Sequence, residues 1–273
     1  WSSDVCSSDL NGEIRIPGLK PGKSVVVTET RAPDGFILDT QSQTVQIKEG
    51  RTVSLTFKNQ PKGALIIQKR DSATGQPLPG AEFRVTTAAG CEVGLDGVIG
   101  DSTLTQNGIF TTDAQGEIKI TNLAPGAYVL TEIKAPTGYV MDSPSTNVVI
   151  GQGGDTQTVI VENSKAGTLV IDKRDSLSGK PLAGVTFRVT TSTGEFVPAE
   201  NGQISSNGLY ITDKDGKIVI NGVVGTLVVT ETKTIPGYTI DEATRTQTVV
   251  VNPNDTQTLH FTNKIGRASC RER

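Results

Sequence analysis

The sequence predicts an all-β protein made of tandem β-sandwich domains, and three observations support this prediction. Val, Ile and Thr dominate short runs that Gly, Pro, Asn and Asp interrupt, which is typical of strands joined by turns. Apolar residues do not recur at helical spacing, and no apolar run is long enough to span a bilayer. Whole segments also repeat along the chain. We therefore expect immunoglobulin-like sandwich domains that follow one another as an extended rod.

The repetition involves three segments that return in the same order. The first is GALIIQKRDSATGQPLPGAEFRVTT from Gly63, which returns as GTLVIDKRDSLSGKPLAGVTFRVTT from Gly167. The second appears as TETRAPDGF, TEIKAPTGY and TETKTIPGY, and the third as the closing runs VSLTFKN, TVIVEN and TLHFTN. The period is about 100 residues, which is the size of one sandwich domain.

This period divides the chain into one partial and two complete repeats. Residues 11–60 correspond to the C-terminal half of a truncated repeat, and residues 64–164 and 168–264 to complete repeats. The joints between them are only a few residues long, which favours a semi-rigid string of domains over freely tumbling ones. We expect each repeat to have its neighbours in the same chain as partners.

The two ends of the chain match nothing else in it. Residues 1–10 and 265–273 back-translate readily into the flanking adapters of short-read DNA sequencing, so we interpret them as scars and exclude them from the fold. The alternative is a pair of divergent tails. If they are scars, the missing signal peptide, anchor or membrane span says nothing about the parent protein. Without the ends, Cys91 is the only cysteine, so neither an internal disulfide nor a zinc site is expected.

The net charge of −3 gives no basic patch for nucleic acid or for an anionic membrane, and we expect neither partner. We also expect no cofactor, no metal and no conventional enzyme. The single histidine, His260, alternates with Phe261 and so faces solvent. The run from Asp213 to Gly216 resembles part of a calcium loop, but the later ligands are missing and a hairpin turn explains it. No helix follows the glycines at 151–154, which argues against a phosphate loop.

Three polar residue types lie in register with apolar residues on predicted strands. Because side chains alternate across a strand, Lys69 shares a face with Leu65 and Ile67. The same alternation places a lysine, a glutamate and an asparagine on the inward face of each complete repeat. The full set is Lys69, Glu132 and Asn163 in one repeat, Lys173, Glu231 and Asn263 in the next, and Glu29 and Asn59 in the partial repeat.

Burying an unpaired ammonium or carboxylate costs several kcal/mol, roughly, so these groups must meet one another or become neutral. The alternative is that each lies at the end of a strand, where water reaches it. The recurrence of the same three residue types in register favours the first interpretation.

These motifs, taken in order, resemble the Cna protein B-type or SpaA-type prealbumin-like domains of Gram-positive surface proteins and pilins. The resemblance rests on KRDS-x-x-G-x-PL-x-G-x-x-F, L-x-PG-x-Y, TE-x-x-AP-x-GY and the closing strand that ends in Asn, and it covers nearly all of residues 11–264. It implies a prealbumin-like sandwich whose first and last strands are joined by a spontaneous Lys–Asn isopeptide bond, assisted by a glutamate.

Carried over by position, the resemblance implies a Lys69–Asn163 bond assisted by Glu132 and a Lys173–Asn263 bond assisted by Glu231. Glu29 and Asn59 match as well, but their partner lysine is in the missing part. The third repeat departs from the motif, because Thr234-Ile235-Pro236-Gly237 shifts the proline by one place and Asn221–Gly225 replaces L-x-PG-x-Y. Its Glu-to-Tyr spacing is unchanged, which predicts the same strand register.

The resemblance implies stalk or shaft repeats of an adhesin or pilin-like protein, extracellular and attached to the cell wall of a Gram-positive bacterium. The self-crosslinking would occur once in each domain and would not be enzymatic turnover. A second hypothesis is an adhesive module that binds a host matrix protein or glycan through its loops. The parent protein, its anchor, its ligand and its assembly into pili stay open.

Overall fold

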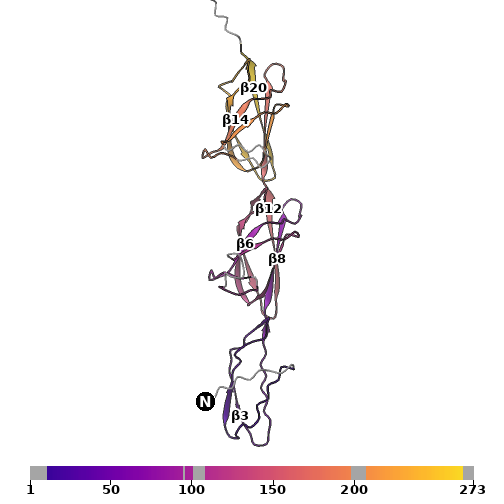
Figure 1. Cartoon of the computed structure of the whole chain (residues 1–273), viewed down its shortest axis with the longest axis vertical. Coiled ribbons are helices and arrows are strands. Elements are labelled where there is room, and N and C mark those ends of the chain that lie inside the picture. Colours follow the sequence, from indigo (N-terminus) through magenta and orange to yellow (C-terminus); the bar gives the residue numbers. More distant parts are fainter. Residues whose placement is uncertain (1–10, 95, 101–107, 198–206, 267–273) are drawn as a thin grey trace, which may run out of the picture.

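The computed structural model describes residues 11–94, 96–100, 108–197 and 207–266. These residues form β-strands and contain no helix, so the predicted all-β class is confirmed, and nothing among them is a helical membrane span. Figure 1 shows three units that follow one another along the long axis of the molecule. The residues interpreted as scars lie outside the described part, except Ile265 and Gly266, and the last strand runs one residue past the expected boundary to Ile265.

The second unit is a sandwich of two four-stranded sheets. One sheet has the order β10-β12-β5-β8 and the other the order β11-β9-β6-β7. The strands are β5 (Gly63–Asp71), β6 (Glu82–Thr87), β7 (Ile109–Thr111), β8 (Glu117–Leu123), β9 (Gly126–Lys134), β10 (Tyr139–Met141), β11 (Ser145–Ile150) and β12 (Thr156–Lys165). Inward-facing residues of both sheets form a single buried core.

The third unit repeats this arrangement strand for strand. Its sheets have the orders β16-β13-β20-β18 and β15-β14-β17-β19. The strands are β13 (Gly167–Asp175), β14 (Thr186–Thr191), β15 (Leu209–Ile211), β16 (Lys217–Val223), β17 (Gly225–Lys233), β18 (Tyr238–Thr239), β19 (Thr246–Val251) and β20 (Thr256–Ile265). A separate core lies between the two sheets.

The described part of the first unit contains two short ladders. Strand β1 (Ser24–Val27) pairs with β3 (Gln43–Gln46), and β2 (Phe36–Ile37) pairs with β4 (Gln60–Pro61). The segment 52–59, which corresponds to β12 and β20, forms no strand here. In the other units this closing strand pairs with the first strand of the unit, and the described part of the first unit holds no such neighbour.

The first and last strands of each complete unit are parallel neighbours. In the second unit β5 and β12 pair from Ala64 with Thr156 to Asp71 with Asn163. In the third unit β13 and β20 pair from Thr168 with Thr256 to Asp175 with Asn263. Parallel strands require a long crossover between them, and here almost the whole unit lies between the two. The inward-facing ends of these strands therefore meet at one end of the unit.

The joints are held by backbone contacts. The Lys165 N–H donates to Asn254 Oδ1 at 3.1 Å, and the Asn254 N–H donates to the Lys165 carbonyl at 2.7 Å. Gly167 starts β13 against the preceding loop, where an added Cβ would lie 2.5 Å from both Asn252 O and Val251 Cγ1. Glycine is required at this position by close packing of the backbone.

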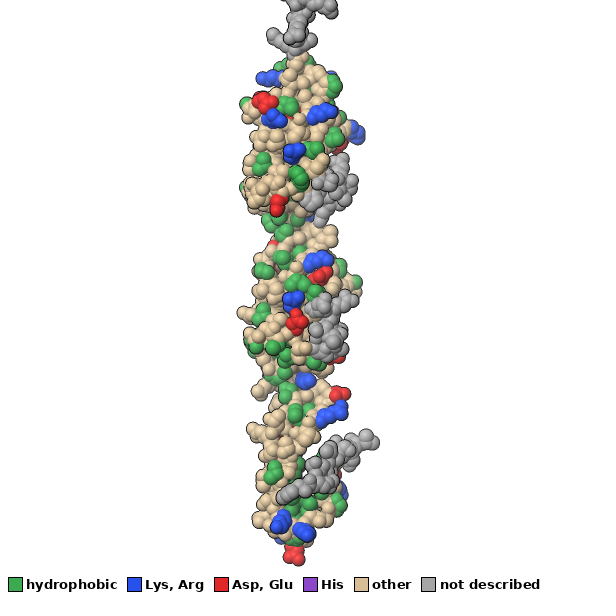
Figure 2. Space-filling model, turned by 60° about the vertical axis from the view of Figure 1, so that its left-hand side comes forward, with side chains coloured by type: hydrophobic (Ala, Val, Ile, Leu, Met, Phe, Trp, Pro, Cys, Tyr) green, Lys and Arg blue, Asp and Glu red, His purple; other side chains and the backbone are tan. Residues whose placement is uncertain are grey.

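Turns and surface agree with the sequence analysis at several points. Gly116 and Gly216 have φ of 71° and 73°, the left-handed region that glycine adopts without strain, in the predicted hairpin turns. His260 is exposed and Phe261 is buried. On the face in Figure 2, basic and acidic side chains are interspersed and do not gather in one large patch of either sign.

Candidate functional site

The second unit brings Lys69, Glu132 and Asn163 together inside its core. Lys69 Nζ donates to Asn163 Oδ1 at 2.5 Å, and Asn163 Nδ2 donates to Glu132 Oε1 at 2.7 Å. Lys69 Nζ lies 3.2 Å from Glu132 Oε2 and closes the triangle. The exposed fractions are 0% for Lys69 and Asn163 and 3% for Glu132. The predicted trio is thus buried, and its three members contact one another through hydrogen bonds and an ion pair.

Strand geometry explains why these side chains meet. Lys69 comes from β5 and Asn163 from its parallel neighbour β12, where Asn163 is aligned with Asp71, two residues beyond the lysine. Glu132 comes from β9 in the opposite sheet and reaches across the core. Because successive strand residues point to opposite faces, all three project between the sheets. The Phe83 ring lies 6.0 Å from Lys69 Nζ and forms part of the apolar wall.

Burial changes the protonation equilibria of the second trio. Desolvation lowers the pKa of Lys69 below its ordinary value, although the charge of Glu132 opposes the shift. Desolvation also raises the pKa of Glu132, against hydrogen bonds from Asn163 and the attraction of Lys69. Both shifts favour a neutral amine beside a protonated carboxyl group.

The third unit repeats the trio with shorter contacts to the carboxylate. Lys173 Nζ donates to Asn263 Oδ1 at 2.6 Å and to Glu231 Oε2 at 2.7 Å, and Asn263 Nδ2 donates to Glu231 Oε1 at 2.6 Å. Burial lowers the pKa of Lys173. Asn263 Nδ2 also donates to Thr234 Oγ1 at 2.7 Å, a contact without a counterpart in the second unit. The departures from the motif in this unit therefore leave the trio assembled.

The first unit holds the remaining two residues in the same relation. Asn59 Nδ2 donates to Glu29 Oε1 at 2.8 Å, and the Asp39 N–H donates to Glu29 Oε2 at 3.2 Å. The buried Asn59 Oδ1 has no hydrogen-bond partner among the described residues. In the complete units, this oxygen accepts a hydrogen bond from the lysine amine.

Comparison with known protein families identifies the family of this chain. The family model of the SpaA prealbumin-like fold domain matches residues 2–61, 63–165 and 167–265, which is nearly the whole chain. The chain belongs to this family. The resemblance inferred from the motifs is confirmed, and the first match extends into the residues interpreted as a scar. No curated protein matches the chain.

Several solved structures are similar to this tandem of SpaA domains. The Bacillus anthracis TIE protein is 28% identical, with a TM-score of 0.41, over 89% of this chain and 42% of that protein, so this chain spans less than half of its length. A streptococcal ancillary pilin is 21% identical, with a TM-score of 0.48, over 91% of this chain and 77% of the other. The shaft pilin SpaA of Lactobacillus rhamnosus GG is 15% identical, with a TM-score of 0.44, over 76% and 98%.

Each complete SpaA domain also contains an Asp–Tyr pair that was not predicted from the sequence as part of the site. The Tyr139 hydroxyl donates to Asp71 Oδ2 at 2.8 Å, and this hydrogen bond lowers the pKa of Asp71. Asp71 Oδ1 accepts from the backbone N–H groups of Ala73 and Thr74. The aspartate thus ties the turn after the lysine strand to the segment after the glutamate strand.

The third SpaA domain has the same pair in Asp175 and Tyr238. Hydrogen bonds from the backbone and hydroxyl of Ser178, with a further one from Tyr238, lower the pKa of Asp175 to about 2. In the sequence, the aspartate recurs as the last residue of KRD and the tyrosine as the last residue of GY in both repeats, and this recurrence could have indicated the pair. The first unit has Phe36 where the others have tyrosine, so it cannot make this hydrogen bond.

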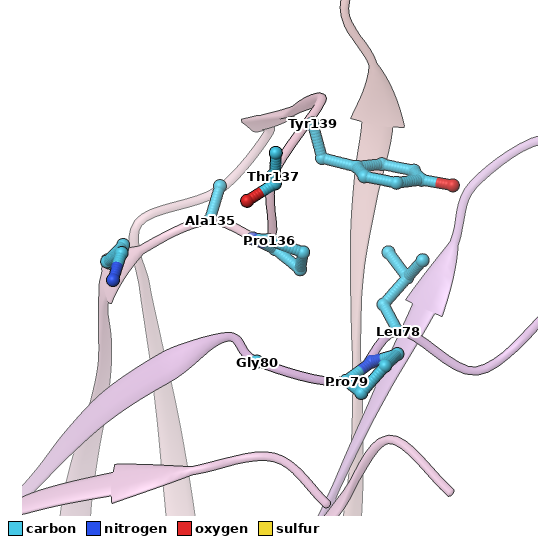
Figure 3. Close-up of a pocket in the computed structure, with 8 residues that line it drawn as sticks. Leu78, Pro79, Gly80, Ala135, Pro136, Thr137 and Tyr139 are labelled. Carbon is cyan, nitrogen blue, oxygen red and sulfur yellow. The ribbon is translucent and has the colours of Figure 1, made fainter. Parts of the chain in front are cut away.

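The second SpaA domain contains a pocket, and one of its lining residues, Leu78, donates its backbone N–H to the Lys69 carbonyl. Figure 3 shows it between two segments, with Leu78 and Pro79 from one, and with Pro136 and the strand residue Tyr139 from the other. None of the three trio residues lines it. In the third domain Ile235 takes the sequence position of Pro136 and packs against the hydrophobic core.

Other candidate groups form no chemical site in the described part of the SpaA domains. No group of three or more His, Cys, Asp or Glu side chains with the geometry of a metal site occurs there. Asp213 caps a hairpin turn, because its Oδ1 accepts from the N–H groups of Asp215 and Lys217. Cys91 is exposed and forms no disulfide.

Proposed function

We propose that this chain is part of the stalk of a surface protein and that its two complete domains close internal Lys–Asn isopeptide bonds. The observation that carries this proposal is the contact of a buried lysine amine with an asparagine carboxamide, at 2.5 Å in one domain and 2.6 Å in the other. A buried glutamate contacts both groups in each case. Residues 11–60 are proposed to be the C-terminal half of a further domain of this kind.

The geometry supports a direct reaction between the amine and the carboxamide. The lone pair of neutral Lys69 Nζ attacks Asn163 Cγ, and a new N–C bond forms while the Cγ–Nδ2 bond breaks. Glu132 donates its proton to the leaving nitrogen and receives one from Nζ, so ammonia departs and the carboxyl group returns to its starting state. The fold supplies the proximity, because it holds the reactants in contact without solvent between them. The reaction takes place once per domain.

Protonation states make burial a requirement for this chemistry. In water a lysine is an ammonium and a glutamate a carboxylate at neutral pH, and an ammonium has no lone pair for attack. Desolvation lowers the pKa of Lys69 and raises that of Glu132, so both move toward their reactive forms. The product also replaces a buried ionisable pair with a neutral amide, which removes the cost of burying charge.

A structural role on the cell surface follows from these bonds and from the tandem arrangement. Each bond links the first and last strands of a domain, and the joints between domains are short and hydrogen bonded. Such a chain resists extension and proteolysis, which suits a stalk or shaft of an adhesin or pilin. We propose an extracellular location, attached to the wall of a Gram-positive bacterium, with neighbouring domains as the partners.

The second candidate function is adhesion to a host matrix protein or glycan through the loops. The observation that favours it is the pocket of Figure 3, which Leu78, Pro79 and Tyr139 line beside a turn. Binding of the folded chain to arrays of matrix proteins and glycans would support this function, and loss of binding in Tyr139→Ala would assign it to the pocket. We favour the stalk, with adhesion in other parts of the parent protein.

Intact-mass measurement of the purified chain tests the proposal. We expect the loss of two molecules of ammonia, one from each complete domain, and peptide mapping should join Lys69 to Asn163 and Lys173 to Asn263. Glu132→Ala and Asn163→Ala should each restore one ammonia. The first unit is the internal control, because Asn59 Oδ1 has no hydrogen-bond partner among the described residues and the peptides of this unit should keep their full mass. An unmodified mass in the folded wild-type chain would refute the proposal.

A further inference from the structure

The two complete domains differ in the hydrogen bonds of the asparagine side-chain nitrogen, which is the leaving group of the proposed reaction. In the third domain Asn263 Nδ2 donates two hydrogen bonds, to Glu231 Oε1 at 2.6 Å and to Thr234 Oγ1 at 2.7 Å. In the second domain Asn163 Nδ2 donates to Glu132 Oε1 at 2.7 Å, and Ala135 stands at the sequence position of Thr234. Alanine has no hydroxyl group and cannot make the second contact.

We propose that Thr234 is a catalytic residue of the third domain that holds the departing nitrogen of Asn263 and makes this isopeptide bond close faster than the one in the second domain. The inference rests on the proposed function, because it concerns the same reaction. It adds a fourth group to the trio and assigns that group to one domain only.

The first effect of Thr234 is on the orientation of the carboxamide. An asparagine carboxamide carries two N–H donors on one side and a carbonyl acceptor on the other. With both N–H groups of Asn263 bonded, to Glu231 and to Thr234, the carbonyl oxygen is directed to Lys173 Nζ. Rotation of the carboxamide by half a turn would break both hydrogen bonds, so the reactive orientation is favoured more strongly here than in the second domain.

The second effect is on the departure of ammonia. As Lys173 Nζ bonds to Asn263 Cγ, the Cγ–Nδ2 bond breaks and Nδ2 takes a proton from Glu231, which is replaced by one from Nζ. The nitrogen leaves as ammonia, and no other reactant is needed. The Thr234 hydroxyl oxygen accepts one N–H of this group throughout, so the nitrogen stays directed away from the new bond.

The turn that follows the glutamate strand explains how threonine reaches the site. In the second domain Pro136 directly follows Ala135, whereas in the third domain Ile235 follows Thr234 and the proline comes one place later. Ile235 packs against the hydrophobic core and anchors the turn. In Figure 3 Ala135 belongs to the turn that borders the pocket, where it presents only a methyl group. The shifted proline and the added hydroxyl are thus parts of one local change.

Closure kinetics of both domains in the same full-length molecule test this inference. The chain is made by cell-free synthesis, the reaction is stopped at intervals by acid, and the cross-linked peptides of each domain are quantified by mass spectrometry. In the wild type we expect the bond of the third domain to form before the bond of the second domain. Thr234→Val keeps the shape of the side chain. It should slow closure in the third domain roughly 2- to 10-fold, which is the effect on a rate of losing one ordinary hydrogen bond, and should leave the rate of closure in the second domain unchanged.

Two further variants separate chemistry from simple structural support. Thr234→Ser keeps the hydroxyl group and should retain most of the rate. Ala135→Thr, or the whole turn exchanged as Ala135→Thr, Pro136→Ile and Thr137→Pro, should speed the second bond, which a purely structural role of Thr234 does not predict. Full closure of Thr234→Val at long times shows that the variant folds.

The outcomes distinguish this inference from the proposed function. If both bonds form in the wild type but Thr234→Val leaves the rate of closure in the third domain unchanged, the proposed role of Thr234 is wrong and the stalk proposal stands. If neither bond forms in the folded wild-type chain, both are wrong. Slowing by Thr234→Val together with retention in Thr234→Ser supports the assignment.

Discussion

Replacement of Glu132 by glutamine provides a quantitative test of what the proposed bond contributes to stability. Glutamine has nearly the shape of glutamate and keeps a carbonyl oxygen near Asn163 Nδ2, but it cannot carry the proton that the reaction needs. The second domain of Glu132→Gln should therefore fold without its bond, while the third domain keeps its own. One molecule then contains a domain with the cross-link and a domain without it.

The magnitude follows from the loop that the bond closes. Lys69 and Asn163 are 94 residues apart in the sequence. A cross-link that closes a loop of this length lowers the entropy of the unfolded chain by an amount equivalent to roughly 4–5 kcal/mol at 25 °C. For a domain of this size that difference corresponds to a change in the midpoint of thermal unfolding of about 20 °C.

Differential scanning calorimetry of the full chain is the appropriate assay, with intact mass as the check on each bond. We expect the transition of the second domain to fall by about 20 °C and that of the third domain to stay in place. Glu231→Gln should produce the reverse pattern. In the double variant Lys69→Met with Glu132→Gln the buried amine is also removed, so the decrease that remains is due to the missing cross-link. A transition that does not move, with the bond absent by mass, would refute the entropic reasoning.

The other predictions concern the Asp–Tyr pair, the reaction's pH dependence and a joint. Tyr139→Phe removes the hydroxyl that donates to buried Asp71, and in a Glu132→Gln background it should lower the free energy of unfolding by about 1–3 kcal/mol in a urea titration, whereas an unchanged midpoint would contradict this role. Closure of the second bond should have a bell-shaped pH profile in timed mass measurements. Because burial lowers the pKa of Lys69 and raises that of Glu132, the rate should fall in acid as the amine is protonated and in alkali as the carboxyl ionises, and a steady rise with pH would argue against a protonated Glu132. Gly167→Ala places a Cβ 2.5 Å from Asn252 O, and it should destabilise the third domain by about 1–3 kcal/mol in calorimetry, with Ala166→Gly as a control of similar size and an unmoved transition as the contrary result.

The trio could be predicted from sequence because strand alternation depends little on tertiary context. Lys69, Glu132 and Asn163 each continue an apolar alternation of period two, and the structure buries all three. Alternation gives the face of a residue but not the neighbour of its strand. Strands β5 and β12 are adjacent and parallel, with Asn163 two residues beyond Lys69. This is a matter of topology, and in the sequence only the family resemblance implies that the first and last strands meet.

The contacts made by the turn after the glutamate strand could not be predicted from the sequence, for a different reason. Tyr139 and Thr234 lie in or directly after the turn that follows the glutamate strand, and each meets a residue near the end of the first or last strand of its domain. No periodicity describes such turns, and a hydroxyl group in a turn has many available partners. The shifted proline of the third repeat is visible in the sequence as a departure from the motif. The structure shows that this departure accompanies an additional hydrogen bond to Asn263.

The parallel pairing of the first and last strands determines which part of a cross-linked domain carries a pulling force. The chain enters the second domain at Gly63, runs along β5 to Lys69, and leaves from Asn163 through β12 toward Lys165. Asn163 is aligned with Asp71, so the proposed bond lies at the exit end of both strands. Once the proposed bond has closed, force would pass along one strand, through the bond and directly into the next domain, and it would bypass the residues between Lys69 and Asn163. An antiparallel last strand would bring the exit back to the entry end, and the domains could not follow one another in the extended line of Figure 1.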